Sequence, residues 1–252
     1  MTLIVNEIYY DRENPGKSRI YSAADRRISC NGSSSGQGKK LFHVDRLNLT
    51  VSYFGLAEGK VKRARARYSF EELISEFIKQ DTSKSIEAFA SQLQRHLNDI
   101  IPPTLLKKYP SGLHVCGFTP KGIPQMWFIT NIGGMDGFFH TNFRPAYSVP
   151  SEELSSVHLK SIYDEQSGEP SKSFSISFQN GDLRSFHAAW QLFDIFSQSM
   201  DMVGLSRHPS TPAEHAARLV WKMKTIAHYY ESVAYQSTIG GKIDVVTLVP
   251  DL

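Results

Sequence analysis

The first part of the chain carries two successive pairs of apolar and β-branched segments. Strands are predicted over residues 2–10, 19–24, 41–44 and 49–54. The turn-forming Asn14-Pro15-Gly16 separates the first two strands, which therefore predict a β-hairpin. The Gly/Ser-rich residues 31–38 predict a loop between the two pairs.

Helical spacing begins at residue 69. Ser69 and Glu72 have the spacing of a capping box, and apolar residues recur behind them at every third or fourth position. A second apolar stripe runs from Ile86 to Ile100 and ends before Pro102-Pro103, because a residue that precedes proline avoids the α region. Two helices that face the core are therefore predicted.

Strand patterns return in the second half of the chain. Residues 113–119 and 125–132 flank the turn Pro120-Lys121-Gly122, so they predict a hairpin that ends at Gly133-Gly134. Residues 173–178 alternate polar and apolar side chains, as a half-buried strand does.

Two further helices and a strand complete the pattern. The first helix follows Asn180-Gly181-Asp182, and its apolar residues are Phe186, Ala189, Trp190, Phe193 and Phe196. The second begins at Thr211-Pro212-Ala213-Glu214, which combines a threonine cap, a proline in the first turn and a glutamate at N3. Its apolar stripe consists of Leu219, Val220, Met223, Ile226, Ala227 and Tyr230. The apolar run 243–249 predicts a buried final strand.

This order of elements predicts two packed sheets with helices on both outer faces. The fold class is therefore α+β, for which a four-layer α/β-β/α arrangement is one option and a generic α+β domain is the alternative. The length suits one large domain or two small ones, and residues 1–252 are interpreted as a single domain. Residues 140–172 hold prolines, serines and acids in no regular order and are interpreted as an insertion.

Composition and charge describe a globular protein. Apolar residues make up 40% of the chain, charged residues 21%, and the net charge is +3. The basic run 60–67 has no interleaved aromatic residue and is interpreted as a solvated surface instead of a nucleic-acid site. Cys30 and Cys116 lack metal-ligand or disulfide spacing, and no signal peptide or membrane span is recognised. We expect a cytoplasmic protein with no cofactor, metal, nucleic-acid or membrane partner.

Thr2 is the first candidate for chemistry. A threonine at a processed N-terminus combines a nucleophilic hydroxyl with a general base, its own α-amine, whose ordinary pKa is about 7.7–8.0. A nearby lysine would lower the pKa of that amine, and a buried lysine needs a carboxylate partner. Taken alone, Thr2 is interpreted as the start of an ordinary strand.

Three motifs extend this interpretation. They are Ala23-Ala24-Asp25-Arg26-Arg27-Ile28-Ser29, Gly38-Lys39-Lys40-Leu41-Phe42-His43-Val44-Asp45 and Gly240-Gly241-Lys242-Ile243-Asp244-Val245-Val246. Their order, and the layout of strands and helices between them, resembles the proteasome β-subunit family of N-terminal nucleophile (Ntn) hydrolases, as a divergent bacterial-type member. The resemblance spans nearly the whole chain and implies a four-layer αββα sandwich.

The resemblance also implies roles for three residues. Thr2 would be the nucleophile once Met1 is removed, Asp25 its acidic partner, and Lys40 the lysine that tunes the amine. Thr2 is small, and initiator methionine is usually removed before such a residue. Without the family pattern, Lys40 would be interpreted as a surface lysine beside Lys39, and Asp25 as a turn-capping carboxylate.

The chain departs from the family at supporting positions. Arg26 replaces the usual serine after the aspartate, and the supporting aspartate and serine fall on Gln236 and Ile239. The family's Gly-Ser-Gly falls on residues 179–181, and its oxyanion-hole glycine falls within residues 52–55. Candidates for support and oxyanion roles are therefore Tyr53, Gly55, Asn180 and Ser237. Altered orienting groups bear directly on peptidase efficiency.

The function expected from the resemblance is a threonine-type hydrolase that cleaves peptide bonds within a self-assembled ring or stack. Its substrate would be a peptide or an unfolded protein, and an unfoldase is a further possible partner. Three alternatives remain: an Ntn hydrolase of small amides, a non-catalytic proteasome-like scaffold subunit, and a basic protein-binding module.

Overall fold

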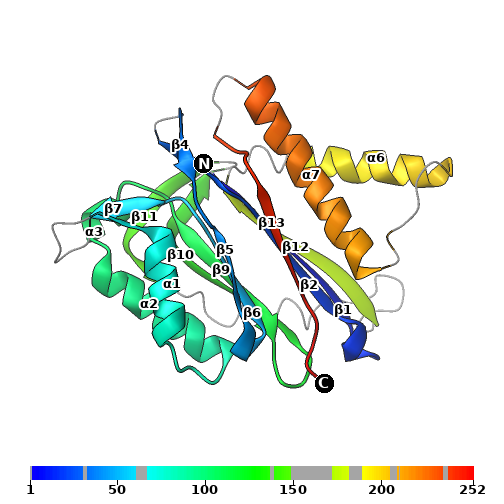
Figure 1. The fold of residues 1–252 in the computed structure, drawn as a ribbon, viewed down its shortest axis with the longest axis horizontal. Coiled ribbons are helices and arrows are strands. Elements are labelled where there is room, and N and C mark those ends of the chain that lie inside the picture. The colour runs from blue at the N-terminus through cyan, green and yellow to red at the C-terminus, as the bar shows by residue number, and fades with distance from the viewer. Residues whose placement is uncertain are drawn as a thin grey trace.

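Figure 1 shows the computed structural model of the chain. It describes residues 2–30, 33–60, 67–136, 139–148, 172–181, 189–204, 209, 211–234 and 238–252. The strands of one antiparallel sheet, in the order β12-β1-β2-β13, are β1 (Leu3–Asp11), β2 (Arg19–Asp25), β12 (Ser173–Gly181) and β13 (Ile243–Leu248). Those of the other, in the order β11-β10-β9-β6-β5, are β5 (Leu41–Val44), β6 (Leu49–Phe54), β9 (Gly112–Phe118), β10 (Pro124–Asp136) and β11 (Phe139–Ser148). The expected α+β class is confirmed.

The first sheet is built around β1. This strand pairs with β2 through a turn that contains a short 3-10 helix, Pro15–Lys17, so the predicted N-terminal hairpin is confirmed. On its other side β1 pairs with β12, and Leu3 lies opposite Gly181. The start of β1 and the end of β12 therefore lie side by side at the same end of the sheet.

The faces of the two sheets that point toward each other share an apolar core. Ile4 and Ala24 of the first sheet lie in one cluster with Leu41 and Phe54 of the second. A second mixed cluster combines residues of both sheets, namely Ile8, Ile20, Cys116, Phe118, Met126 and Leu248. Because side chains alternate across a strand, Thr2 and Asn6 are on the same face of β1 as Ile4.

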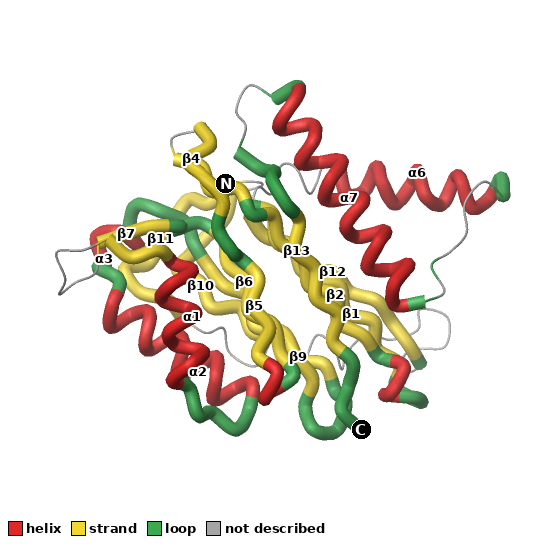
Figure 2. The backbone as a smooth tube through the Cα atoms, viewed as in Figure 1, coloured by secondary structure: helices red, strands yellow, loops and turns green. Residues whose placement is uncertain are grey.

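Helices cover the opposite faces of the sheets (Figure 2). The second sheet carries α1 (Phe70–Gln80) and α2 (Ile86–Ile100), followed by the short α3 (Pro103–Leu106). Their apolar residues, among them Ile74, Phe89 and Leu93, join Val51 and Val115 in the largest core cluster. The predicted capping box of Ser69 and Glu72 is present.

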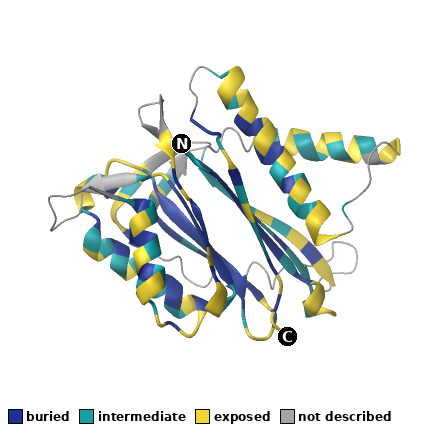
Figure 3. Cartoon of the chain, in the orientation of Figure 1, coloured by how far each residue is buried: buried dark blue, intermediate teal, exposed yellow. Residues whose placement is uncertain are grey.

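The first sheet is covered by α7 (Pro212–Ser232), whose predicted capping box at Thr211 is also present. Leu219, Met223 and Ile226 of this helix pack on Leu3 and Val5 of β1. The neighbouring helix α6 (Gln191–Met202) projects from the body in Figure 1, and Figure 3 colours its residues as exposed or intermediate.

Several segments differ from the sequence-based expectation. Instead of a loop, Ser33–Gln37 forms β4, which pairs with β3 (Arg27–Cys30), because backbone pairing in a hairpin does not need side chains of high β-propensity. A further small hairpin joins β7 (Glu58–Lys60) to β8 (Arg67–Ser69), and a 3-10 turn, Asp45–Leu47, connects β5 to β6.

Three other expectations are also corrected or limited. β10 does not end at Gly133-Gly134 but continues to Asp136, through register shifts in its pairing with β11. β13 is an edge strand with Val245 exposed, so its apolar run does not mark a strand buried on both faces. The first part of the proposed insertion 140–172 belongs to β11, whereas residues 149–171 and Phe186 lie outside the described residues.

Candidate active site

The beginning of β1 is enclosed by the neighbouring strands. Thr2 is only 5% exposed, and the next backbone amide, that of Leu3, donates a hydrogen bond of 2.8 Å to Oδ1 of Asp25. Gly181 has a positive φ of 117°, and a β-carbon there would overlap the carbonyl oxygen of Thr2. A glycine is therefore required at position 181 both for its conformation and for its contact with Thr2.

Asp25 and Lys40 form a buried ion pair that joins the two sheets. Asp25 is the last residue of β2, whereas Lys40 immediately precedes β5. Lys40 Nζ lies 3.0 Å from Asp25 Oδ1, and the two side chains are 1% and 0% exposed. The carbonyl oxygen of Arg27 also accepts a hydrogen bond from Lys40 Nζ. Burial lowers the pKa of Lys40 below its ordinary value, and the attraction of Asp25 opposes this shift.

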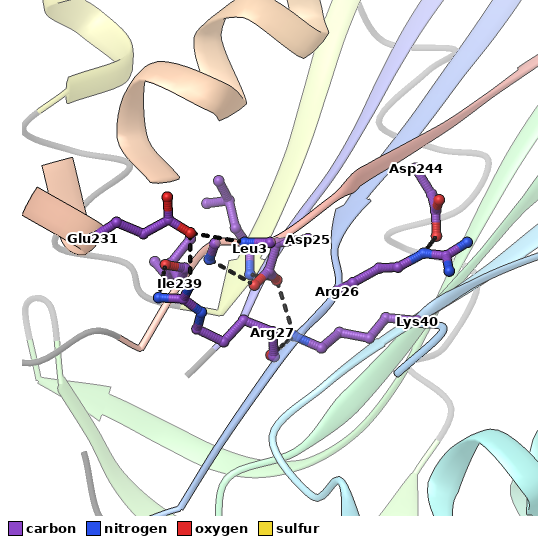
Figure 4. Close-up of polar contacts among 10 residues, drawn as sticks. Leu3, Asp25, Arg26, Arg27, Lys40, Glu231, Ile239 and Asp244 are labelled. Atoms are coloured by element: carbon purple, nitrogen blue, oxygen red, sulfur yellow. Dashed lines mark hydrogen bonds and ion pairs between the residues drawn. The ribbon is translucent and has the colours of Figure 1, made fainter. Parts of the chain in front are cut away.

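The loop before β13 supplies a third contact to Asp25. The backbone amide of Gly240 donates a hydrogen bond of 3.2 Å to Asp25 Oδ2. Each oxygen of the carboxylate therefore has a separate set of donors: Oδ1 binds Leu3 N and Lys40 Nζ, and Oδ2 binds Gly240 N (Figure 4). Such an arrangement fixes both the position and the rotation of the carboxylate.

A second ion pair holds the same loop. Arg27 Nη2 lies 2.6 Å from Glu231 Oε1, near the end of α7, and the same oxygen accepts from the amide of Gly241 at 3.1 Å (Figure 4). The amide of Arg27 donates to the carbonyl oxygen of Gly240. Arg27 and Glu231 thus connect α7 with the loop that contacts Asp25.

Arg26 makes a different contact. Its Nε lies 2.6 Å from Asp244 Oδ2 on β13, and this pair makes none of the hydrogen bonds that reach Asp25. Arg26 stands at the position where the family resemblance expects a serine. Through its ion pair with Asp244, its side chain links the end of β2 to β13.

The candidate support residues lie in different environments. Tyr53 donates its backbone amide to the carbonyl of Lys40 at 3.2 Å, and its ring packs between Phe42 and Phe70 on the helix side of the sheet. Gly55 has a positive φ of 91° and is packed against the backbone of Pro110. The side chain of Tyr53 therefore points into the core on the helix side of its sheet, and Gly55 allows the turn directly after β6.

Among the support candidates that the structure describes, Asn180 lies on β12, the strand that pairs with the start of β1. It pairs with Ile4, and its neighbour Gly181 contacts Thr2. Its side chain lies 2.8 Å from Nε2 of His114 on the second sheet. Ser237 and Gln236 lie outside the described residues, whereas Ile239 is a buried core residue.

The sequence did not indicate His114, Arg27 or Glu231 as parts of the site. His114 occupies an ordinary position in the apolar strand β9, and Glu231 is one of several polar residues at the end of α7. Arg27 lies within the Asp25 motif, but no role was predicted for it from the sequence. Contacts across 204 residues of sequence, such as that between Arg27 and Glu231, require the tertiary structure.

The site offers a lysine cation, a carboxylate and backbone donors near a threonine. Within the described ranges, no three metal-ligating side chains gather into one group, and no helix is long and apolar enough to cross a membrane. No protein-family model matches the sequence, and a search of curated proteins returned no match. The residues and their geometry must therefore carry the functional argument.

Proposed function

We propose that the chain is a threonine-type Ntn hydrolase that cleaves amide bonds, with the four-layer αββα sandwich of proteasome subunits. The observation that carries this proposal is the buried pair of Lys40 and Asp25, which a hydrogen bond connects to the amide directly after Thr2. A buried lysine–carboxylate pair is costly to desolvate, so it is expected where its charge has a use.

The mechanism begins after removal of Met1. The free α-amine of Thr2 takes the Oγ proton, directly or through a water molecule, while Oγ attacks the carbonyl carbon of the substrate. The C–N bond of the amide breaks, and the leaving amine takes the proton from the Thr2 ammonium. Water then attacks the resulting ester with the amine again as base, which releases the acid and restores Oγ–H.

Lys40 tunes both groups by its charge. A nearby cation lowers the pKa of the α-amine, so that more of the amine is an unprotonated base at neutral pH. The same cation stabilises negative charge that develops on Oγ. Asp25 keeps Lys40 charged inside the protein and aligns the first amide of β1.

The decisive experiment combines intact-mass measurement with an epoxyketone probe. We expect the mature chain to begin at Thr2 and to gain one probe molecule, whereas Thr2→Ala and Lys40→Met variants gain none. A Thr2→Ser variant is the matched control, because it retains a hydroxyl nucleophile. Mature, folded protein that begins at Thr2 and stays unlabelled would refute the proposal.

A non-catalytic scaffold subunit is the second candidate. The observation that favours it is the burial of Thr2, which is 5% exposed and so has little contact with solvent. A retained Met1 in the purified protein would favour this candidate, because an acylated amine cannot act as the base. A small-amide hydrolase would label at Thr2 but would hydrolyse small amides in preference to peptides.

We further propose that the protein self-associates and acts on peptides or unfolded proteins. The projecting helix α6 exposes large apolar side chains, with Leu192 63%, Ile195 59% and Phe196 52% exposed. On α7, Trp221 and Tyr229 are also exposed, and the ring of Trp221 contacts that of Phe193 on α6. An exposed apolar surface of this kind is typical of a contact between proteins, and a second copy of the chain is the proposed partner.

A further inference from the structure

A continuous chain of polar side chains crosses the apolar space between the two sheets. Thr50 Oγ1 lies 2.6 Å from Ser22 Oγ, and Ser22 Oγ lies 2.6 Å from Asn6 Oδ1. Asn6 Nδ2 lies 2.7 Å from His114 Nδ1. On the other side of the imidazole ring, Nε2 lies 2.8 Å from the side-chain amide of Asn180.

The imidazole of His114 determines which atom donates and which atom accepts in these hydrogen bonds. The ring is fully buried, and burial lowers its pKa to about 3, so it is neutral at physiological pH. A neutral imidazole has one N–H donor and one acceptor nitrogen. It therefore cannot accept from the amide nitrogens of both Asn6 and Asn180.

The other contacts of Asn6 and Asn180 determine which of the two side-chain amides must be rotated by 180°, so that its oxygen faces the ring. Asn6 Oδ1 is already engaged by Ser22, so Asn6 Nδ2 donates to Nδ1 of His114. His114 Nε2–H then donates to Asn180, which presents Oδ1 because the oxygen and nitrogen of an amide exchange by a 180° turn. All bonds then run in one direction, from Thr50 to Asn180.

This chain connects the strands that carry the candidate active site. Asn6 and Ser22 lie on β1 and β2, which also carry Thr2 and Asp25. Thr50 and His114 lie on the second sheet, to which Lys40 is joined through β5. The site therefore depends on how one sheet lies on the other.

Apolar contacts alone specify the position of one sheet on the other poorly, because the hydrophobic effect has no direction. Hydrogen bonds have both direction and a narrow range of lengths. At the end of the chain, Asn180 directly precedes Gly181, which is in contact with Thr2. A displacement of Asn180 would be transmitted to Thr2 through one residue.

We propose that the buried hydrogen-bond chain Thr50–Ser22–Asn6–His114–Asn180 is a positioning device for the active site. It fixes the two sheets relative to each other, so that Lys40 meets Asp25 and Gly181 seats Thr2. His114 and Asn180 are thus positioning residues that act through others. This inference rests on the proposed hydrolase function for its catalytic consequence, but its structural part can be tested without activity.

The first measurement uses the unmodified protein. Nitrogen-15 NMR of histidine-labelled protein reports the tautomer of His114, and we expect a neutral ring protonated at Nε2. This form should persist at pH 5, where an exposed histidine carries a positive charge. A ring protonated at Nδ1, or a charged ring at pH 5, would overturn the proposed direction of the chain.

The second measurement uses three variants. Asn180→Ala and His114→Phe remove links of the chain, and Cys116→Ala is the matched control because Cys116 is buried two residues further along the same face of β9. Hydrogen exchange at the amides of Leu3 and Gly240 reports the contacts of Asp25. We expect faster exchange at both amides in Asn180→Ala, and unchanged exchange in Cys116→Ala.

Labelling of Thr2 by the epoxyketone gives the catalytic consequence. We expect the maximal rate of labelling to fall about tenfold in Asn180→Ala with little change in the probe concentration for half-maximal rate, as for a misplaced nucleophile. Should His114→Phe fail to fold, Asn180→Ala and the tautomer still decide the question. Unchanged exchange and labelling in Asn180→Ala would overturn the proposal. An unlabelled wild-type protein with the expected exchange pattern would refute the hydrolase function alone.

Discussion

Lys40 Nζ and Asp25 Oδ1 lie 3.0 Å apart, and neither side chain is more than 1% exposed. Two opposite charges without solvent stabilise each other strongly but are costly to bury. Removal of one partner leaves the other charge uncompensated, whereas removal of both eliminates the cost. This asymmetry allows a catalytic role to be separated from a structural one.

We predict that Lys40→Met lowers the free energy of unfolding by about 3–5 kcal/mol and abolishes labelling of Thr2. The reason is that methionine fills a similar volume but leaves the carboxylate of Asp25 without its cation. Urea denaturation measures the first effect and the epoxyketone probe the second.

The double variant Lys40→Met with Asp25→Asn is the control for this prediction. It should regain much of the lost stability, because no buried charge remains, but it should stay unlabelled. Labelling of the double variant at the wild-type rate would show that Lys40 has no part in the chemistry.

We predict that Gly181→Ala disrupts the N-terminal strand. An alanine there would combine a positive φ with an overlap between its β-carbon and the carbonyl of Thr2. The matched control is Gly36→Ala, since Gly36 also has a positive φ but no atom lies near the position of the added carbon. The control should lose about 1–3 kcal/mol of stability from strain alone, and Gly181→Ala should lose more. Equal losses in thermal or urea unfolding would contradict the contact with Thr2.

The ion pair of Arg27 and Glu231 should matter more for the site than the neighbouring pair of Arg26 and Asp244. We predict that Glu231→Ala slows labelling of Thr2 about tenfold, because the loop that donates to Asp25 loses its anchor on α7. Asp244→Ala is the control, as it breaks an ion pair of the same 2.6 Å length. Similar labelling rates for the two variants would speak against a role of Glu231 in positioning Asp25.

His114 gives a prediction for the dependence of stability on pH. Its pKa is about 3 in the folded protein and about 6.5 when exposed, so the unfolded chain binds one more proton between these values. The contribution of the neutral ring is therefore fully present above pH 6.5 and is lost as the pH falls toward 3. The urea midpoint of wild type should decrease more between pH 7 and pH 5 than that of His114→Phe. The same decrease in both proteins would show that the pKa of His114 is not lowered in the folded protein.

The exposed apolar surface of α6 predicts an oligomer that point mutations can dissociate. We expect light scattering to give a smaller molar mass for a combined Leu192→Glu and Phe196→Glu variant than for wild type, because charges at a buried contact are costly. Tyr109→Glu is the control, since Tyr109 is also 50% exposed but lies after α3. A wild-type monomer at micromolar concentration would contradict self-association through this surface.

Local patterns in the sequence were sufficient for most of the elements. Capping residues at Ser69 and Thr211 marked the helix starts, because these contacts depend on neighbours three positions away. The strands β5 and β6 were likewise recognised from apolar runs bounded by polar residues. The hairpin at Ser33–Gln37 was missed, because its pairing depends on the backbone and not on side-chain type.

The site was only partly accessible from the sequence. Asp25 and Lys40 were identified through a family resemblance, and the structure brings them into direct contact. Glu231 and His114 were missed, because their importance comes from partners far away in the chain. Tyr53 and Gly55 were candidates because the family's oxyanion-hole glycine falls within residues 52–55. In the structure the Tyr53 side chain belongs to the core on the helix side of the sheet, and Gly55 packs against the backbone of Pro110.

The contact between Gly240 and Asp25 spans 215 residues of sequence. A growing polypeptide on the ribosome therefore carries Thr2, Asp25 and Lys40 long before it carries the amide that completes the surroundings of Asp25. The strand that follows Gly240, β13, must also pair with β2 before that amide is in place. Under the proposed hydrolase function, the surroundings of Asp25 are therefore completed only after nearly the whole chain has been translated.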